Sequence, residues 1–163
     1  MNLILVVGVT LAIGIGSGLR AFTPIALVSW LSIWGWIPLA GSPLWFLGTN
    51  TCAIIASLAA IGELIADKFP KIPSRILPGP LGVRIVTGAV SAGALFFAAG
   101  RSWFFGLPFG ALGSVVGAFG GYYGRQFLTR RLPVPDLVVA LLEDFLTIAG
   151  TLLLVHSFFG TSI

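Results

Sequence analysis

The sequence predicts an all-α fold: a polytopic membrane bundle of about six helices that cross the bilayer or re-enter it, in one domain over residues 1–163. Of these residues, 57% are hydrophobic and only 9% are charged, whereas ordinary soluble domains carry about 25% charged residues. So few charged side chains could not cover the surface of a soluble protein of this length. The chain is therefore expected to be an integral membrane protein with the lipid bilayer as its main partner.

The helices follow from the length needed to cross the hydrocarbon core, about 20 residues. The run from Leu3 to Trp36 contains one charge, Arg20, and is too long for a single crossing. Glycines at 14, 16 and 18 mark the expected break, and the resulting first helix is short enough to be re-entrant. The predicted helices cover residues 3–16, 18–36, 44–68, 81–99, 109–130 and 136–159.

Charged loops and tryptophans both predict an orientation. Basic residues flank the loops at 69–80 and 131–135, namely Lys68, Lys71, Arg75, Arg125, Arg130 and Arg131, while the opposite connections carry at most Arg101. The positive-inside rule places the loops at 69–80 and 131–135 in the cytoplasm. The tryptophans gather toward the other side, as in an interfacial aromatic belt, at Trp30, Trp34, Trp36, Trp45 and Trp103.

Six ionisable residues fall in the cytoplasmic half of the predicted spans: Arg20, Glu63, Asp67, Arg84, Glu143 and Asp144. An unpaired charge in the membrane costs about 2.5–3.5 kcal/mol on insertion scales. We therefore expect these groups to compensate one another across the bundle. Arg20 is expected to pair with Glu143 or Asp144, or with Glu63.

A short internal similarity suggests a two-fold repeat. The segment GLRAFTPIA (18–26) resembles GVRIVTGAV (82–90), which aligns Arg20 with Arg84 and Thr23 with Thr87. Duplicated membrane halves with broken helices often build a binding site at their interface. If both arginines occupy the first turn of a helix, the helix N-termini and guanidinium groups together favour an anion.

The segments GLRAFTP, GELIADKFPKIP and LLEDFLTIAG resemble a family of small bacterial integral membrane proteins catalogued as a domain of unknown function. The likeness covers nearly the whole chain. Its most specific part is Glu63, Ala66, Asp67, Lys68 and Pro70 in a Glu-x-x-Ala-Asp-Lys-x-Pro stretch. The resemblance implies a bacterial cytoplasmic (inner) membrane and no particular chemistry.

Glycine also recurs along the predicted helix at 109–130, with Gly113, Gly117 and Gly121 at four-residue spacing. Such a stripe of small residues lets two helix backbones approach closely. Packing within the chain is the favoured interpretation, and a homo-oligomer seam is the alternative.

Two functions remain open. The first is a transporter or channel for a small solute, with an anion and proton coupling favoured, that uses the Arg/Glu/Asp cluster. The second is a non-catalytic scaffold or assembly subunit in which the same charges form a structural salt-bridge network. No enzyme activity, cofactor, metal site or nucleic-acid partner is expected, because Cys52 and His156 are each single and no catalytic set accompanies them.

Overall fold

The computed structural model describes residues 2–67, 74–131 and 134–159. Within these residues the chain forms six α-helices and no strand, which confirms the all-α prediction. The helices are α1 (Leu3–Leu19), α2 (Thr23–Ile33), α3 (Asn50–Ala66), α4 (Pro78–Ala98), α5 (Gly106–Arg131) and α6 (Asp136–Phe159). Two short 3-10 helices, η1 (Trp45–Gly48) and η2 (Trp103–Phe105), precede α3 and α5.

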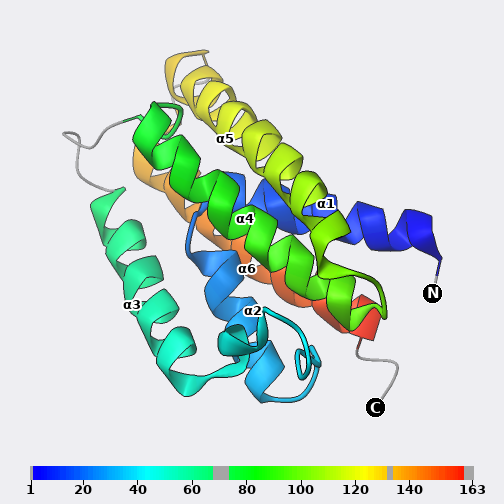
Figure 1. Cartoon of the computed structure of the whole chain (residues 1–163). Helices are drawn as coiled ribbons and strands as arrows, with labels where there is room; N and C mark the ends of the chain where they lie inside the picture. The colour runs from blue at the N-terminus through cyan, green and yellow to red at the C-terminus, as the bar shows by residue number, and fades with distance from the viewer. Residues whose placement is uncertain (1, 68–73, 132–133, 160–163) are drawn as a thin grey trace.

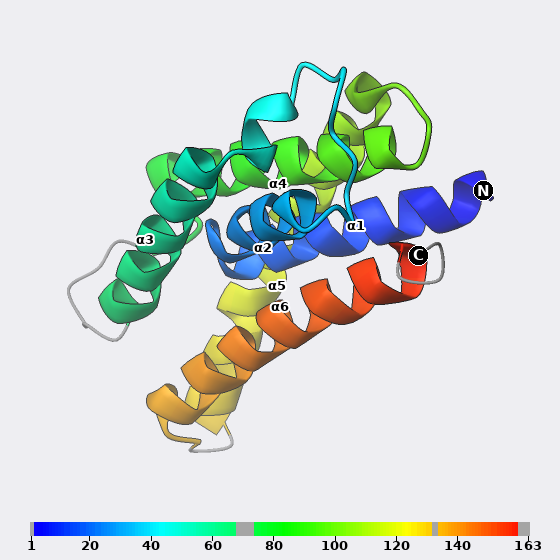
Figure 2. The same ribbon diagram turned by 90° about the horizontal axis from the view of Figure 1, so that it is seen from below.

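Helices α1, α4 and α5 pack closely and form the centre of the bundle (Figure 1). Helix α6 lies along α1 and α2, while α3 packs on α2 at one edge (Figure 2). The start of α1 and the end of α6 lie at the same end of the bundle. The C-terminal ends of α3 and α5 and the N-terminal ends of α4 and α6 lie toward the other end.

In the described part of the chain, three helical segments are long and apolar enough to cross a membrane: Pro78–Ala98, Trp103–Arg131 and Asp136–Phe158. Helices α1, α2 and α3 are shorter apolar helices. Large apolar side chains project outward, among them Leu58, Val116 and Leu146, each at least 60% exposed. Apolar side chains on the outside of an apolar bundle fit a lipid environment, and the protein is a multi-pass helical membrane protein.

The predicted break at Gly14–Gly18 is wrong. Helix α1 continues through these glycines to Leu19, and a Cβ atom added to Gly14 would lie 2.5 Å from the Gly110 carbonyl oxygen of α5. These glycines therefore serve close packing of two backbones rather than a turn. The chain breaks instead at residues 20–22, because Pro24 has no amide N–H to donate to the Arg20 carbonyl and its ring would clash with that carbonyl in a continuous helix. Proline suits the first turn of a new helix.

The short helix is the second one, not the first. Helix α2 has 11 residues, or roughly 16 Å at 1.5 Å per residue, about half of the hydrocarbon thickness. It ends where Gly35 adopts a φ of +83°. The amide N–H groups of Gly35 and Trp36 then donate to the carbonyls of Ser32 and Leu31 at 3.1 and 2.9 Å, a Schellman motif. The predicted helix over 18–36 was thus too long at both ends.

Other predicted boundaries also move. Helix α3 begins at Asn50 rather than at residue 44, because the Thr49 hydroxyl caps it by accepting a hydrogen bond from the Cys52 amide at 3.3 Å. Helix α4 begins at Pro78 rather than at 81, since proline is tolerated in a first turn, and α5 begins at Gly106 rather than at 109. Helix α6 covers the predicted range 136–159. Lys68 and Lys71 lie outside the described residues.

The glycine stripe of α5 faces α1. A Cβ atom on Gly113 or Gly117 would collide with the carbonyl oxygens of Leu11 or Ile15, and one on Gly121 would lie 2.6 Å from a methyl carbon of Leu19. Helix α1 thus occupies this face within the same chain. A second copy could reach it only if α1 and α5 separated.

Candidate functional site: a buried network of ion pairs

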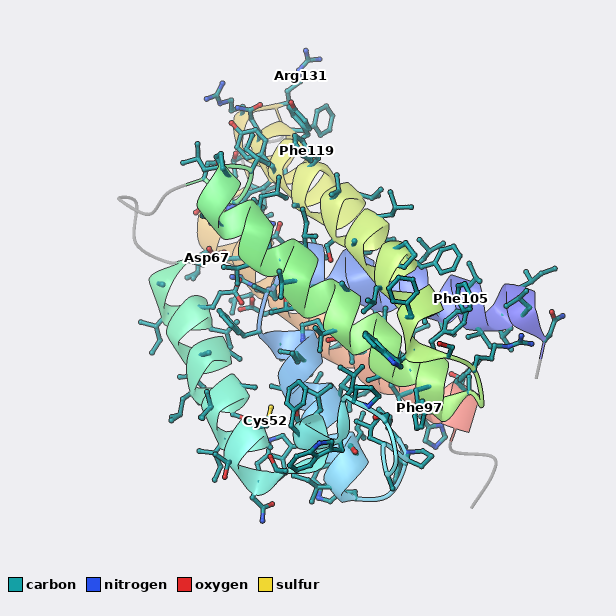
Figure 3. All side chains as sticks on the ribbon, in the orientation of Figure 1. Cys52, Asp67, Phe97, Phe105, Phe119 and Arg131 are labelled. Atoms are coloured by element: carbon teal, nitrogen blue, oxygen red, sulfur yellow. The ribbon has the colours of Figure 1, made fainter. Side chains whose placement is uncertain are left out.

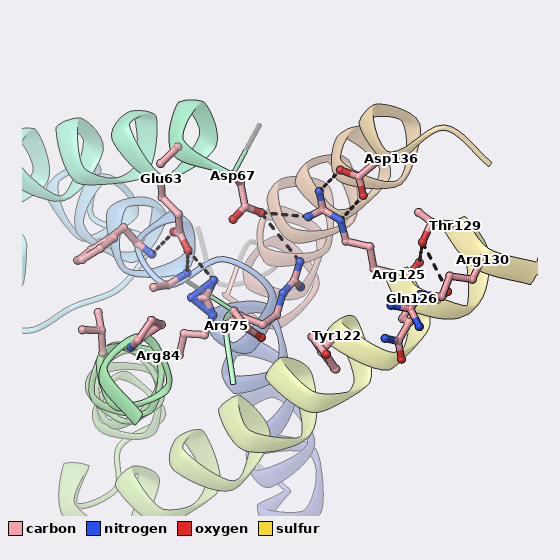
Figure 4. A pocket seen from close by; sticks show the side chains of 16 residues that line it. Glu63, Asp67, Arg75, Arg84, Tyr122, Arg125, Gln126, Thr129, Arg130 and Asp136 are labelled. Carbon is pink, nitrogen blue, oxygen red and sulfur yellow. Dashed lines mark hydrogen bonds and ion pairs between the residues drawn. The ribbon is translucent and has the colours of Figure 1, made fainter. Parts of the chain in front are cut away.

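All five side-chain carboxylates of the sequence belong to one cluster that also contains four arginines. Ion pairs join seven of the nine residues, and Glu63 and Arg84 form a separate pair beside them. We call this cluster the ion-pair network. Its members come from α3, α4, α5 and α6 and from the segments that precede α2 and α4 (Figure 4). They are Arg20, Glu63, Asp67, Arg75, Arg84, Arg125, Asp136, Glu143 and Asp144.

Arg20 is the centre of the network and is fully buried. Its Nη1 lies 2.5 Å from Asp67 Oδ2, and its Nη2 lies 2.5 Å from Asp144 Oδ1. Its predicted pairing with Asp144 is present, whereas Glu143 and Glu63 pair with other arginines. Asp67, at the C-cap of α3, is the partner that the sequence analysis did not assign to Arg20.

Glu143 pairs with Arg75 through two parallel hydrogen bonds. Arg75 Nη1 and Nη2 donate to the two carboxylate oxygens at 3.0 and 2.8 Å, and both side chains are less than 10% exposed. This bidentate geometry is the strongest arrangement available to arginine and a carboxylate. Sequence reasoning had treated Arg75 only as a loop cation that sets orientation.

The carboxylate of Glu63, a residue of α3, lies at the N-terminal end of α2. Its two carboxylate oxygens accept hydrogen bonds from the backbone amides of Ala21 and Phe22 at 2.8 and 3.0 Å. Arg84 Nη2 lies 3.1 Å from the same carboxylate. Free amides at a helix start favour an anion, so a side chain of the protein itself occupies a ready-made anion position.

Arg125 links the buried pairs to the outer end of the network. It donates to both carboxylate oxygens of Asp136 at 2.7 and 2.6 Å, and its Nη1 lies 3.4 Å from Asp67 Oδ2. The sequence analysis assigned neither Arg125 nor Asp136 to the site. Both lie near helix ends, where a charge needs no special explanation.

The two predicted threonines do not join the ion pairs. Thr87 donates to the carbonyls of Val83 and Arg84 in its own helix, at 3.0 and 3.2 Å. The Thr23 hydroxyl is buried and has no hydrogen-bond partner among the described residues. Arg84, moreover, lies more than one turn inside α4 rather than in its first turn, because α4 begins at Pro78.

A cavity of about 770 Å³ adjoins the network. Its wall includes Glu63, Asp67, Arg75, Arg84, Arg125, Arg130 and Asp136, together with Tyr122, Gln126 and Thr129 (Figure 4). Arg20, Glu143 and Asp144 are not part of this wall. The network therefore has a layer that lines the cavity and an inner layer, Arg20, Glu143 and Asp144, that does not.

The described residues contain no cluster of His, Cys, Asp and Glu that could hold a metal ion. Every carboxylate of the network instead faces at least one arginine. Ionisable side chains among apolar membrane helices are costly unless they are paired, and in this network they are paired.

Comparison with known proteins gives a family. A family model described as Domain of unknown function (DUF4126) matches residues 7–157, a range that includes the whole ion-pair network. No match is found among curated proteins or among solved structures. The matched range covers nearly all of the chain, and the protein belongs to the DUF4126 family.

Proposed function

We propose that the protein is a proton-coupled transporter of a small anionic solute, and that Glu63 holds the solute's place when no solute is bound. One observation carries this proposal. The carboxylate of Glu63 accepts hydrogen bonds from the amides of Ala21 and Phe22 and pairs with Arg84, at the wall of a large cavity. The same three groups would bind the anionic part of a solute.

Proton coupling follows from the position of Glu63. Its negatively charged carboxylate already occupies the two amides and Arg84, so a second anion could bind there only if that charge were removed. Protonation of Glu63 removes that charge and frees the two amides and Arg84 for the solute. Loss of the proton lets Glu63 return and displace the solute, which links solute movement to proton movement.

A structural scaffold is the second candidate function. It is favoured by the pairing of every arginine in the network with at least one carboxylate. Buried pairs of this kind can fix the register of packed helices without binding any ligand. On either candidate the protein is non-catalytic.

The location proposed for this function is the cytoplasmic membrane of a bacterium. The loops at 69–80 and 131–135 face the cytoplasm in this proposal. Two features support this orientation. The loops are basic, and the tryptophans lie in the last turn of α2 or just after it, in η1 and in η2.

Proteoliposomes loaded with a pH-sensitive dye test the transport proposal. Addition of chloride, phosphate, sulfate or a short dicarboxylate outside should acidify the lumen for at least one of these anions. Glu63→Gln should uncouple the proton from the anion, and Arg84→Gln should reduce the flux. The matched control is Arg131→Gln, which removes an arginine from the C-terminal end of α5, outside the network (Figure 3).

The result that would favour the scaffold is specific. If Glu63→Gln and Arg84→Gln fold normally and leave both anion and proton flux equal to that of Arg131→Gln, the network does not transport. The wild-type protein would then also show no flux above protein-free liposomes.

A further inference from the structure

An apolar groove of about 410 Å³ lies between α2, α3 and α4. Helix α3 contributes Cys52, Ile55 and Ala59, while Ile25 of α2 and Thr87 of α4 complete much of the wall. The groove exists because α3 packs on α2 rather than on α4, and Figure 1 shows α3 set apart from α4. Figure 3 shows Cys52 on the side of α3 that faces α2.

The groove lies next to the charged cavity. Phe22 belongs to the walls of both. On α3 the wall changes from Ala59 in the groove to Glu63 in the cavity, and on α4 it changes from Thr87 to Arg84. Each change takes three or four residues, about one helical turn, so the apolar and charged spaces are neighbours along two helices at once.

The anion position lies at the junction of the two spaces. The amide of Phe22 holds the Glu63 carboxylate, and Phe22 also borders the groove. Arg84, only 5% exposed, keeps a buried Nε that has no hydrogen-bond partner among the described residues. The Glu63 carboxylate thus leaves one donor of Arg84 unused, and an apolar chain attached to a charged group at the position of Glu63 could follow the groove.

We infer that the protein binds an amphiphilic carboxylate, with its carboxylate at the Ala21, Phe22 and Arg84 position and its unbranched apolar chain in the groove between α3 and α4. This inference rests on the proposed function, because it uses the same anion position and names the class of solute. The resident group at that position is itself a planar carboxylate that spans two successive amides, which favours a carboxylate over a tetrahedral phosphate.

The route of such a ligand is lateral. The groove and the bilayer are similarly apolar, so transfer of the chain between them changes little free energy. The charged end must then provide the selectivity, since it exchanges the membrane interface for two amides and an arginine. An amphiphile would enter from the bilayer between α3 and α4 and displace Glu63 once that side chain is protonated.

Photochemical labelling in vesicles of neutral phosphatidylcholine tests the inference. The probe is hexadecanoic acid with a diazirine in the middle of its chain, compared with its methyl ester and with an alkyl phosphate of equal length. The acid should label groove residues on α2 and α3. The ester should label them about tenfold less, as expected for loss of a charge-assisted hydrogen bond, and the phosphate should also label less.

Two tryptophan variants of α3 provide a matched pair. Ala59→Trp places an indole in the groove, whereas Leu58→Trp places it on the lipid-facing side, where Leu58 is 65% exposed. Ala59→Trp should abolish the labelling of groove residues, and Leu58→Trp should leave it unchanged. Glu63→Gln should increase labelling by the acid, because the resident competing carboxylate is gone.

Equal labelling by acid and ester in the wild-type protein would overturn the inference even if Ala59→Trp failed to fold. Equal labelling by the alkyl phosphate would overturn the choice of carboxylate. The outcomes for the transport proposal are distinct. Proton flux driven by small anions without groove labelling would refute the amphiphilic ligand and leave the transport proposal standing. Selective groove labelling by the acid without any flux would support the binding site and refute transport.

Discussion

Replacement of Arg20 by glutamine tests how the inner layer of the network is held together. Within the described residues Asp144 has one ion-pair partner, Arg20, at 2.5 Å. Asp67 would keep Arg125 at 3.4 Å and Arg75 at 3.9 Å. Arg20→Gln therefore leaves mainly Asp144 without a cation, in a site where its side chain is 14% exposed. Removing one partner of a buried pair costs about 3–5 kcal/mol, and we expect a loss of this size in the free energy of unfolding.

A double-mutant cycle separates this pair from its surroundings. Asp144→Asn in the Arg20→Gln background removes the stranded charge and should recover about 2 kcal/mol, within the usual range for residues in contact. Glu143→Gln is the matched control, because Glu143 is the neighbour of Asp144 but pairs with Arg75. Its coupling to Arg20 should be clearly smaller.

Unfolding in mixed micelles by increasing mole fractions of dodecyl sulfate, followed by far-UV circular dichroism, gives the four free energies of each cycle. Additivity within about 0.5 kcal/mol for Arg20 and Asp144 would refute their direct coupling. A larger coupling of Arg20 with Glu143 than with Asp144 would refute the assignment of pairs as a whole.

Two further predictions concern packing and topology. Gly117→Ala should destabilise the protein by about 1–3 kcal/mol through overpacking against α1. Gly120→Ala on the same helix, where a Cβ atom meets nothing within 4 Å, should be neutral or stabilising. Equal effects of the two substitutions in a dodecyl sulfate titration would contradict close α1–α5 packing. Cysteines at Ala40 and Gly79, in a Cys52→Ser background, should react with an impermeant maleimide from opposite sides of the membrane, with Gly79 on the cytoplasmic side. Reaction of both from one side would contradict the predicted orientation.

It could be predicted that the chain is a helical membrane protein, because this property depends on composition and on the lengths of apolar runs. Helix α6 was predicted with its bounds, since the prolines at 133 and 135 mark its start in the sequence. The α1–α2 break was misplaced because glycine has two uses in membrane helices, in turns and in close contacts. Only the tertiary structure shows that Gly14 faces α5.

Six members of the network could be predicted from one rule, that a charge inside an apolar span needs a partner. The rule does not reach Arg75, Arg125 and Asp136, which lie in a loop or near helix ends where water is the default partner. A count of charges offered a partial signal: among the residues first singled out, four carboxylates faced only two arginines. That imbalance indicated that further cations had to come from elsewhere in the chain, without showing which.

The brevity of α2 has a consequence for the order in which the protein assembles. The amides of Ala21 and Phe22 open this half-length helix, and a backbone amide inside a bilayer needs an internal acceptor. That acceptor, Glu63, belongs to α3, and the two acids that neutralise Arg20 follow it at positions 67 and 144. The first two helices therefore leave the ribosome before any of their partners exist. The compensation of Arg20 is complete only when α6, the last helix, has joined the bundle.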